Sequence, residues 1–208
     1  MNDQAPSDRL RAGLDVLRLE LDGMQVQRLQ DYLALLAKWN RAFNLTAVRD
    51  EGEMVVKHLL DSLAVYRWFA VERVLDVGSG AGLPGIPLAI ARPDTDFVLL
   101  DSNGKKTRFM TQAVHALGLD NVDVVQARVE SWRPPGGLYD VVTSRAFASL
   151  SDMLRLAAPL SKPGGKIVAM KGRLNAEEGA EAGFRLRTEP VSVPGLDAER
   201  HVIIAETL

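Results

Sequence analysis

A short apolar run that contains one acid is followed by three alternating glycines in the first half of the chain. The run Val74–Val77 contains Asp76 and is followed by Gly78, Gly80 and Gly82. Because glycine has no Cβ, these three positions can adopt positive φ and let the backbone approach a ligand closely. A parallel strand that passes into a helix beneath a nucleotide-like ligand has this pattern. We therefore predict a strand, a ligand-binding glycine loop and a helix, in that order.

Two classes of ligand fit the glycine spacing. Counted from Gly80, the glycines at 80, 82 and 85 have the G-x-G-x-x-G spacing of a dinucleotide site, so NAD is not excluded. Counted from Asp76, the pattern Asp-x-Gly-x-Gly-x-Gly resembles the first motif of S-adenosylmethionine-dependent methyltransferases. An ordinary glycine-rich turn is the third interpretation. Because one glycine motif is a weak signal, the rest of the chain must decide between them.

The ends of the next two predicted strands supply further candidate contacts. In open parallel sheets, ligands bind outside the carboxyl ends of the strands. Asp101 follows a strand predicted over 96–100, where its carboxylate could accept both ribose hydroxyls of a nucleoside or could instead cap the next helix. Val129 and Glu130 follow a strand predicted over 122–126, at a place suited to adenine. Glu130 could equally be a solvated surface acid.

The fourth predicted strand, over 139–143, ends at Ser144–Phe147, where methyltransferases hold the methyl acceptor. The Asp/Asn-Pro-Pro-aromatic motif that serves exocyclic amino groups is absent there, and the chain has no cysteine for attack at pyrimidine C5. A ring nitrogen with its own lone pair, such as guanine N7, needs neither device. Methylation of that atom leaves no proton to remove. We therefore expect no general base, and alignment of the reactants would supply most of the rate.

Alternating strands and helices must position these residues. We predict an α/β fold, a Rossmann-like methyltransferase sheet of seven strands with the last one antiparallel, preceded by an N-terminal helical extension. Strands are expected over 74–77, 96–100, 122–126, 139–143, 165–170, 184–193 and 201–206. Helices are expected over 7–21, 26–39, 50–69, after Gly85, and over 104–117, 150–160 and 175–182. The last two strands should form a hairpin, since Pro194 and Gly195 leave no room for a crossover helix.

Composition narrows the class of protein. A length of 208 residues suits one compact unit, in which 1–70 form a helical cap and 71–208 form the methyltransferase domain. The net charge of −2 argues against a strongly basic nucleic-acid clamp but allows a local cationic patch. The absence of cysteine excludes disulfides and thiolate metal sites, and we predict no metal. Without a signal peptide or a membrane-spanning apolar segment, we expect a cytoplasmic monomer with no membrane partner.

Several blocks of the sequence occur in an order that matches a known family. They are Trp39–Thr46, His58–Ser62, Leu75–Ile90, Asp101–Lys106, Arg128–Glu130 and Ser144–Phe147. Together they resemble the RsmG (also GidB) family of bacterial 16S ribosomal RNA guanine-N7 methyltransferases, from about residue 24 to the C-terminus. The resemblance implies methyl transfer from S-adenosylmethionine to N7 of one guanine in the RNA of the small (30S) ribosomal subunit.

The resemblance also implies a set of cofactor contacts, and the residues at the strand ends add to this set. By similarity they are Gly78, Leu83, Val129, Glu130 and Arg145. Reasoning from the glycine loop and the strand ends adds Gly80 and Asp101. Arg145 is expected to position the reactants, bonding guanine O6, a phosphate or the cofactor, because N7 must stay open to take the methyl. Alternatively, Arg145 pairs only with a nearby carboxylate such as Asp76 or Glu130.

Polar and aromatic residues around the predicted cofactor rim are candidate RNA contacts. They are Arg41, Asn44, His58, Lys105, Lys106, Phe147 and Lys171. Phe147 could offer a face to an unstacked base. Lys105 and Lys106 could equally lie on a solvated helix face, and His58 could instead pair with Asp61 three residues later.

Other classes of function stay open at this point. A small-molecule methyltransferase would keep the cofactor motifs without needing a basic rim. An NAD(P)-dependent oxidoreductase would use the glycines at 80, 82 and 85, but the chain lacks a Tyr-x-x-x-Lys pair for hydride transfer. A non-catalytic RNA-binding module is disfavoured, because Asp76, Asp101 and the glycines occur together. Whether the RNA is naked, in an assembly intermediate or in the mature subunit is left open.

Overall fold

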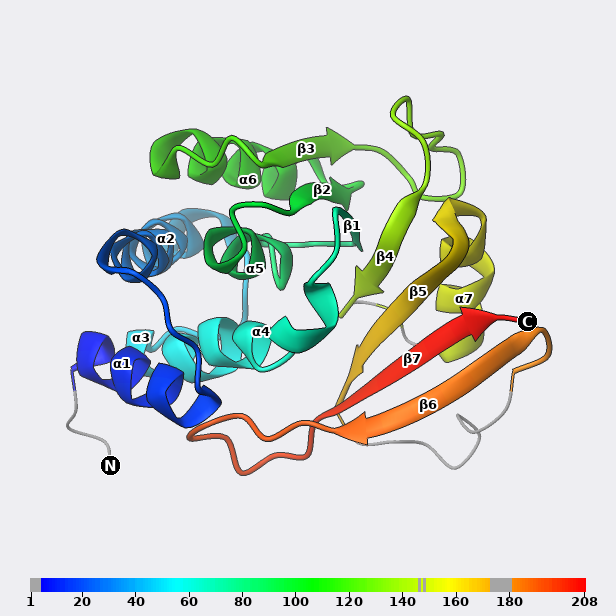
Figure 1. Ribbon diagram of the computed structural model, residues 1–208. Helices are drawn as coiled ribbons and strands as arrows, with labels where there is room; N and C mark the ends of the chain where they lie inside the picture. The colour runs from blue at the N-terminus through cyan, green and yellow to red at the C-terminus, as the bar shows by residue number, and fades with distance from the viewer. Residues whose placement is uncertain (1–4, 146, 148, 173–180) are drawn as a thin grey trace.

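A seven-stranded sheet forms the centre of the protein (Figure 1). The computed structural model describes residues 5–145, 147, 149–172 and 181–208. The strands are β1 (Arg73–Val77), β2 (Asp96–Asp101), β3 (Val122–Gln126), β4 (Tyr139–Ser144), β5 (Ser161–Lys171), β6 (Phe184–Pro190) and β7 (His201–Thr207). Their order is β3-β2-β1-β4-β5-β7-β6. The pairs from β3 to β5 are parallel, and β7 runs antiparallel to both β5 and β6, which confirms the predicted fold class.

The strands form because their apolar residues are buried on both faces of the sheet, as parallel strands require. In β1, Val74 belongs to the core on one face, whereas Leu75 and Val77 belong to the core on the other. The same alternation in β2 places Phe97 and Leu99 on the first face. The acid Asp76 is the exception in this apolar run, and it is fully buried.

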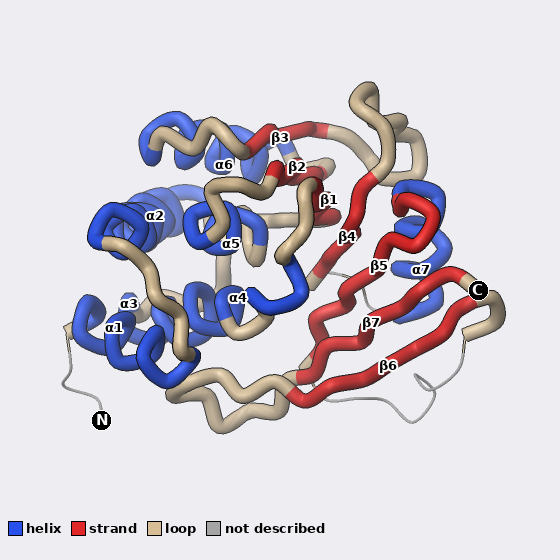
Figure 2. The backbone as a smooth tube through the Cα atoms, viewed as in Figure 1, coloured by secondary structure: helices blue, strands red, loops and turns tan. Residues whose placement is uncertain are grey.

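Helices cover the two faces of the sheet unequally (Figure 2). They are α1 (Pro6–Leu17), α2 (Gly23–Phe43), α3 (Glu51–Met54), α4 (Asp61–Leu63), α5 (Gly85–Ala91), α6 (Gly104–Leu117) and α7 (Leu150–Ala157), with the π-helix η1 (Val55–Leu60) and the 3₁₀ turns η2 (Tyr66–Phe69) and η3 (Ala158–Leu160). The N-terminal helices lie with α5 and α6 on one side, and α7 lies on the other (Figure 1). Tyr32 and Leu36 of α2 share one core with Phe97 and Phe109. No helix among the described residues is long and apolar enough to cross a membrane.

The predicted boundary between the first two helices is wrong. The first helix does not reach the predicted residue 21, and Asp22 caps α2: its carboxylate accepts the Gln25 amide at 2.8 Å and the Gln25 side chain accepts the Asp22 amide at 2.9 Å. This reciprocal capping box fixes the start of α2. The first helix stops at Leu17, where Arg18 adopts the left-handed conformation.

The helix predicted over 26–39 ends later than expected, because α2 continues to Phe43. Asn40 is buried, and its side chain bonds the following loop on both sides. Its Nδ2 donates to the Val48 carbonyl at 2.9 Å and its Oδ1 accepts the Thr46 amide at 2.9 Å. Asparagine is common in loops, but here Asn40 is a buried helical residue whose side chain holds the following loop in place.

The single helix predicted over 50–69 is broken into four pieces. Its start is confirmed, since Asp50 accepts the Glu53 amide at 2.8 Å. A π-helical segment then runs from Val55 to Leu60, and π-helical turns occur frequently at functional sites. This segment carries His58 and leads directly to Asp61, and both side chains are buried.

The remaining predictions agree with the structure except at some boundaries. The helix over 104–117 and the strand over 122–126 are confirmed. The fifth strand begins four residues early, at Ser161, and the helix predicted over 150–160 ends as a 3₁₀ turn. Most of the helix predicted over 175–182 lies outside the described residues.

Candidate cofactor and acceptor site

The loop after β1 has the backbone that its glycines predict. The φ angles are 69° at Gly78, 63° at Gly80 and 85° at Gly82, all in the left-handed region. At Gly80 the positive φ alone demands glycine, since an added Cβ would meet no atom closer than 3.9 Å. The loop therefore presents bare backbone at the carboxyl end of β1, as a ligand-binding turn requires.

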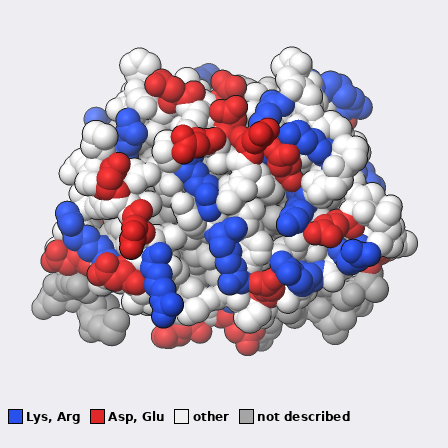
Figure 3. Space-filling view, viewed as in Figure 1, with Lys and Arg blue, Asp and Glu red and all other residues white. Residues whose placement is uncertain are grey.

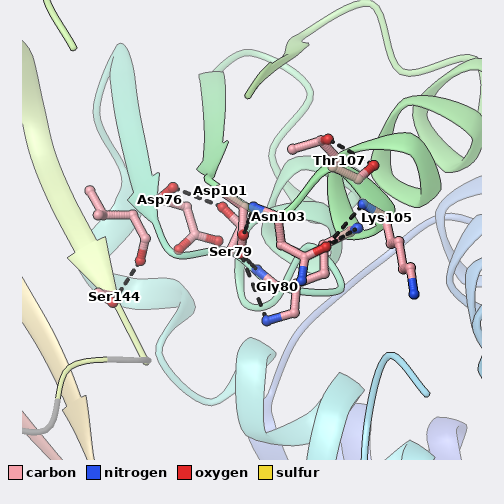
Figure 4. Close-up of polar contacts among 11 residues, drawn as sticks. Asp76, Ser79, Gly80, Asp101, Asn103, Lys105, Thr107 and Ser144 are labelled. Carbon is pink, nitrogen blue, oxygen red and sulfur yellow. Dashed lines mark hydrogen bonds and ion pairs between the residues drawn. The ribbon is translucent and has the colours of Figure 1, made fainter. Parts of the chain in front are cut away.

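The carboxylate of Asp101 joins this loop to the end of β2 (Figure 4). Its Oδ2 accepts the Gly80 amide at 2.9 Å, and its Oδ1 accepts the Asn103 amide at 2.8 Å. Asn103 is the residue that caps α6, because its side chain accepts the Lys105 amide at 2.9 Å. The alternative interpretation of Asp101 as a helix cap is therefore wrong.

A cavity lies beside Asp101. It is lined by Val77, Gly78, Leu100, Asp101, Ser102, Lys106, Ala127, Arg128, Val129, Glu130 and Phe147. Four residues predicted to contact the cofactor are among them, namely Gly78, Asp101, Val129 and Glu130. A carboxylate beside apolar side chains is the lining that a nucleoside needs, with hydroxyls at one end and a flat base at the other. The residues present therefore fit an adenosyl group.

The other predicted cofactor residues lie apart from that lining. Leu83 is buried in the core beneath the loop, and Gly80 reaches the cavity through its bond to Asp101. Arg145 lines a different cavity. Two predicted RNA contacts, Lys106 and Phe147, lie instead in the Asp101 cavity, and Lys106 Nζ is 4.0 Å from Asp101 Oδ2.

Asp76 places a buried carboxyl group beneath the glycine loop. Its Oδ2 accepts the Gly85 amide at 3.0 Å, and its Oδ1 is buried without a hydrogen-bond partner in the part of the chain that the structure describes. Burial raises the pKa of the Asp76 carboxyl to about 7, although the Gly85 amide opposes the shift. A cation bound above the loop would stabilise the ionised form of this group.

A second cavity lies at the carboxyl ends of β4 and β5. It is lined by Asp61, Val65, Arg145, Met170, Lys171, Gly172, Val191, Arg200 and His201. Arg145 Nη1 lies 3.1 Å from Asp61 Oδ2, and Arg200 Nε donates to Asp61 Oδ1 at 2.8 Å. His201 Nδ1 bonds the Gly172 carbonyl at 2.9 Å. The buried carboxylate of Asp61 thus contacts two guanidinium groups.

The partners of Arg145 and His58 differ from those expected. Arg145 pairs with a carboxylate, but with Asp61 rather than Asp76 or Glu130. His58 Nε2 bonds Thr46 Oγ1 at 2.9 Å, so His58 and Asp61 have different partners. Burial lowers the pKa of the His58 imidazole. With 5% of its surface exposed, His58 supports the loop after α2 in this structure.

The remaining RNA candidates lie at the surface. Arg41 and Lys105 are exposed, and Asn44 ends α2 in the left-handed conformation. Lys171 lines the second cavity. On the face seen in Figure 3, basic and acidic side chains are interspersed and neither forms a continuous surface. Contacts with a phosphate backbone would therefore be local on this face.

Sequence reasoning missed Arg200 and the role of Asp61. A signal for Arg200 exists, because it precedes a strand predicted to be antiparallel. The start of such a strand lies at the edge where parallel strands end, and His201 indeed pairs with Lys171 at the end of β5. Asp61 has no comparable signal, since its partner Arg200 is 139 residues away in the sequence.

Comparisons with known proteins agree with this geometry. The family model for GidB, rRNA small subunit methyltransferase G, matches residues 25–203. The chain is 50% identical over 204 residues to ribosomal RNA small subunit methyltransferase G of Nitrosococcus oceani, covering 97% of this chain and 95% of that protein. It is 52% identical over 198 residues to the protein of the same name from Chromobacterium violaceum, covering 93% and 94%.

Solved structures share the fold at low sequence identity. The O-methyltransferase TomG from Streptomyces achromogenes, solved in complex with SAM, has a TM-score of 0.61 at 16% identity, with 98% of this chain and 99% of that chain covered. TrmN from Thermus thermophilus has a TM-score of 0.55 at 22% identity, covering 71% and 48%. These likenesses show that the sheet and its helices form a methyltransferase fold.

Proposed function

Since the chain belongs to the rRNA small subunit methyltransferase G family, we infer that it transfers a methyl group from S-adenosylmethionine to the RNA of the small ribosomal subunit. The oxidoreductase and small-molecule alternatives lose their support, because the relatives match over almost the whole chain and are rRNA methyltransferases.

We propose further that the acceptor atom is N7 of a guanine in 16S RNA. Two observations support this proposal: Ser144–Phe147 lacks the Asp/Asn-Pro-Pro-aromatic motif and the chain has no cysteine, and a pair of cavities around the end of β4 gives each reactant a place. Phe147 lines the Asp101 cavity, and Arg145 lines the Asp61 cavity. A cofactor in the first and a base in the second would meet where β4 ends.

The residues of the first cavity would hold the cofactor by its adenosyl group. Asp101 would accept the ribose hydroxyls with the lone pairs that its two backbone bonds leave free. Val129 and Phe147 would pack against the base, and the glycine loop would admit the rest of the molecule. S-adenosylmethionine, when bound, supplies an electrophilic methyl group on a sulfonium.

The chain would accelerate the reaction by alignment rather than by moving a proton. The lone pair of guanine N7 would attack the methyl carbon as the methyl–sulfur bond breaks, so that the sulfur leaves as a neutral thioether and the positive charge passes to the base. Holding the two reactants in line can contribute about 7–11 kcal/mol to lowering a barrier. Arg145, which is partly exposed and lines the second cavity, is the residue that we propose positions the base.

The molecular context is also part of the proposal. We propose that the helices of 1–70 form one compact unit with the domain of 71–208, supported by their shared core. We also propose that the protein acts as a monomer on 30S subunits in the cytoplasm, where its substrate is found.

The test is methyl transfer from labelled S-adenosylmethionine to whole 30S subunits and to naked 16S RNA, with the modified base identified after nuclease digestion. The expected product is 7-methylguanine at one position. Large subunits serve as the control and should take up no label. Label on another base, or on an exocyclic nitrogen, would reject the N7 assignment.

A further inference from the structure

Asp61 and Arg145 present a carboxylate and a guanidinium next to one another in the wall of the second cavity. Asp61 Oδ2 lies 3.1 Å from Arg145 Nη1, and Asp61 Oδ1 is held by Arg200. The cavity has a volume of about 310 Å³, at the small end of the range for ligand sites. That size suits one unstacked base rather than a helical stretch of RNA.

Asp61 and Arg145 can still form further hydrogen bonds with a ligand. An ionised carboxylate has about four lone-pair sites, and each Asp61 oxygen has one guanidinium neighbour. Arg145 Nη1 is buried and has no hydrogen-bond partner among the described residues, since its contact with Asp61 is an ion pair without hydrogen-bond geometry. A buried donor left unsatisfied costs stability unless a ligand completes it.

The order of these groups matches one edge of one base. From Arg200 toward Arg145, the wall presents two carboxylate acceptors and then a guanidinium donor. The Watson–Crick edge of guanine presents the N2 amino donor, the N1–H donor and the O6 acceptor. Adenine would instead place the N1 lone pair against the carboxylate, and that contact is repulsive.

We propose that Asp61 and Arg145 read the Watson–Crick edge of the target guanine, with N1–H and N2–H₂ donating to Asp61 and O6 accepting from Arg145. The inference rests on the proposed function and names the base-reading residues of its acceptor site. N7 lies on the imidazole ring, away from the edge that is read. This mode therefore leaves N7 open, whereas the common arginine fork to O6 and N7 would block it.

The position of Asp61 suits this role. Two arginines hold its carboxylate in one orientation, and the residue is buried, with 3% of its surface exposed. Unstacked bases are read in this way when single-stranded RNA is recognised, by hydrogen bonds to the Watson–Crick edge. A site built to bond a donor rejects an analogue that lacks it, because its own polar groups are then left unpaired.

The test combines a protein variant with a substrate variant. Small subunits are reconstituted with 16S RNA that carries either guanosine or inosine at the target position, since inosine lacks only the N2 amino group and keeps N7. We measure kcat/KM for wild type and Asp61→Asn on both. Wild type should prefer guanosine by about tenfold to a hundredfold, and Asp61→Asn should reduce that preference to about threefold or less.

Two controls make the result specific. Asp140→Asn removes another acid that pairs with a cation, since Asp140 lies 2.7 Å from Lys162 at the start of β4, away from the second cavity. This variant should keep the wild-type preference. Asp61→Glu keeps the charge but displaces the carboxylate by one methylene, and it should lose the preference as Asp61→Asn does. This second variant gives the answer even where Asp61→Asn does not fold.

The outcomes separate this inference from the function on which it rests. If wild type does not methylate guanosine in the small subunit, the proposed function fails. If wild type methylates it and the Asp61 variants keep the same preference for guanosine over inosine as wild type, Asp61 supports the fold without reading the base. Only the base-reading inference is then overturned.

Discussion

The amide of Gly80 donates a hydrogen bond to Oδ2 of Asp101, with an N···O distance of 2.9 Å. This bond ties the glycine loop after β1 to the end of β2, so one carboxylate shapes the loop and faces the adjoining cavity. Asn103 donates to the other oxygen at 2.8 Å. Because both oxygens are already oriented by backbone amides, the carboxylate is organised before a nucleoside binds, which lowers the cost of binding.

Asp101→Asn should weaken S-adenosylmethionine binding by about tenfold to a hundredfold, since hydrogen bonds to a charged group contribute about 1.5–3 kcal/mol. Asparagine keeps the size of the side chain but replaces one acceptor oxygen by an NH₂ donor. This donor would face a backbone amide and a ribose hydroxyl that are donors themselves, so those hydrogen bonds would be lost. Isothermal calorimetry measures the dissociation constant. Asp123→Asn, at an exposed acid on β3, is the matched control and should bind as wild type does. An unchanged constant for Asp101→Asn, with the fold intact, would reject the ribose assignment.

Asp76 should make the free energy of unfolding depend on pH. Its pKa is raised in the folded protein to about 7, so the folded state binds one more proton than the unfolded state between about pH 4 and pH 7. The contribution of this group is therefore fully present below pH 4 and is lost as the pH rises through 7. Relative to Asp76→Asn, wild type should lose stability across this window by up to about 1.4 kcal/mol per pH unit.

Urea denaturation of both proteins between about pH 4.5 and 8 checks this prediction. The asparagine can still accept the Gly85 amide, so the comparison isolates the titration of the carboxyl group. A difference in unfolding free energy that stays constant across the range would contradict the raised pKa.

The rate of the chemical step should show no such dependence. If guanine N7 is the acceptor, no side chain has to lose a proton during transfer. With cofactor and 30S subunits both saturating, the single-turnover rate should be flat from about pH 6.5 to 8.5. A rise through a single ionisation would indicate a general base and another acceptor atom.

Local signals made much of the fold predictable. The glycine loop, β3 and α6 follow from residue types and apolar periods that act within a few positions. The break in the helix predicted over 50–69 could not be read in the same way, because a π-helical turn widens the helix without a glycine or proline to mark it. Its register is set by what the segment packs against.

The same distinction between local and long-range signals applies to the candidate site. Asp101 and Val129 could be found because each follows a predicted strand, and the parallel topology brings strand ends to one edge. Asp61 meets Arg200 only after the chain has closed its last hairpin. A single sequence carries no record of such a contact, and so it points to Asp76 or Glu130 rather than Asp61 as the carboxylate partner of Arg145.

Arg145→Ala should lower methyl transfer to 30S subunits by at least about tenfold while leaving the fold intact, since losing a bond to a charged group costs about 1.5–3 kcal/mol. The fold should survive because Arg200 still pairs with Asp61 at 2.8 Å and the arginine side chain is partly exposed. Arg145→Lys should recover little activity, because an ammonium group does not reproduce the planar guanidinium. Arg155→Ala, at an exposed arginine of α7 that pairs with Asp152 at 3.2 Å, is the control and should transfer methyl groups as wild type does. Rates come from labelled cofactor with the folded state checked by thermal unfolding, and near-wild-type transfer by either Arg145 variant would remove this residue from the site.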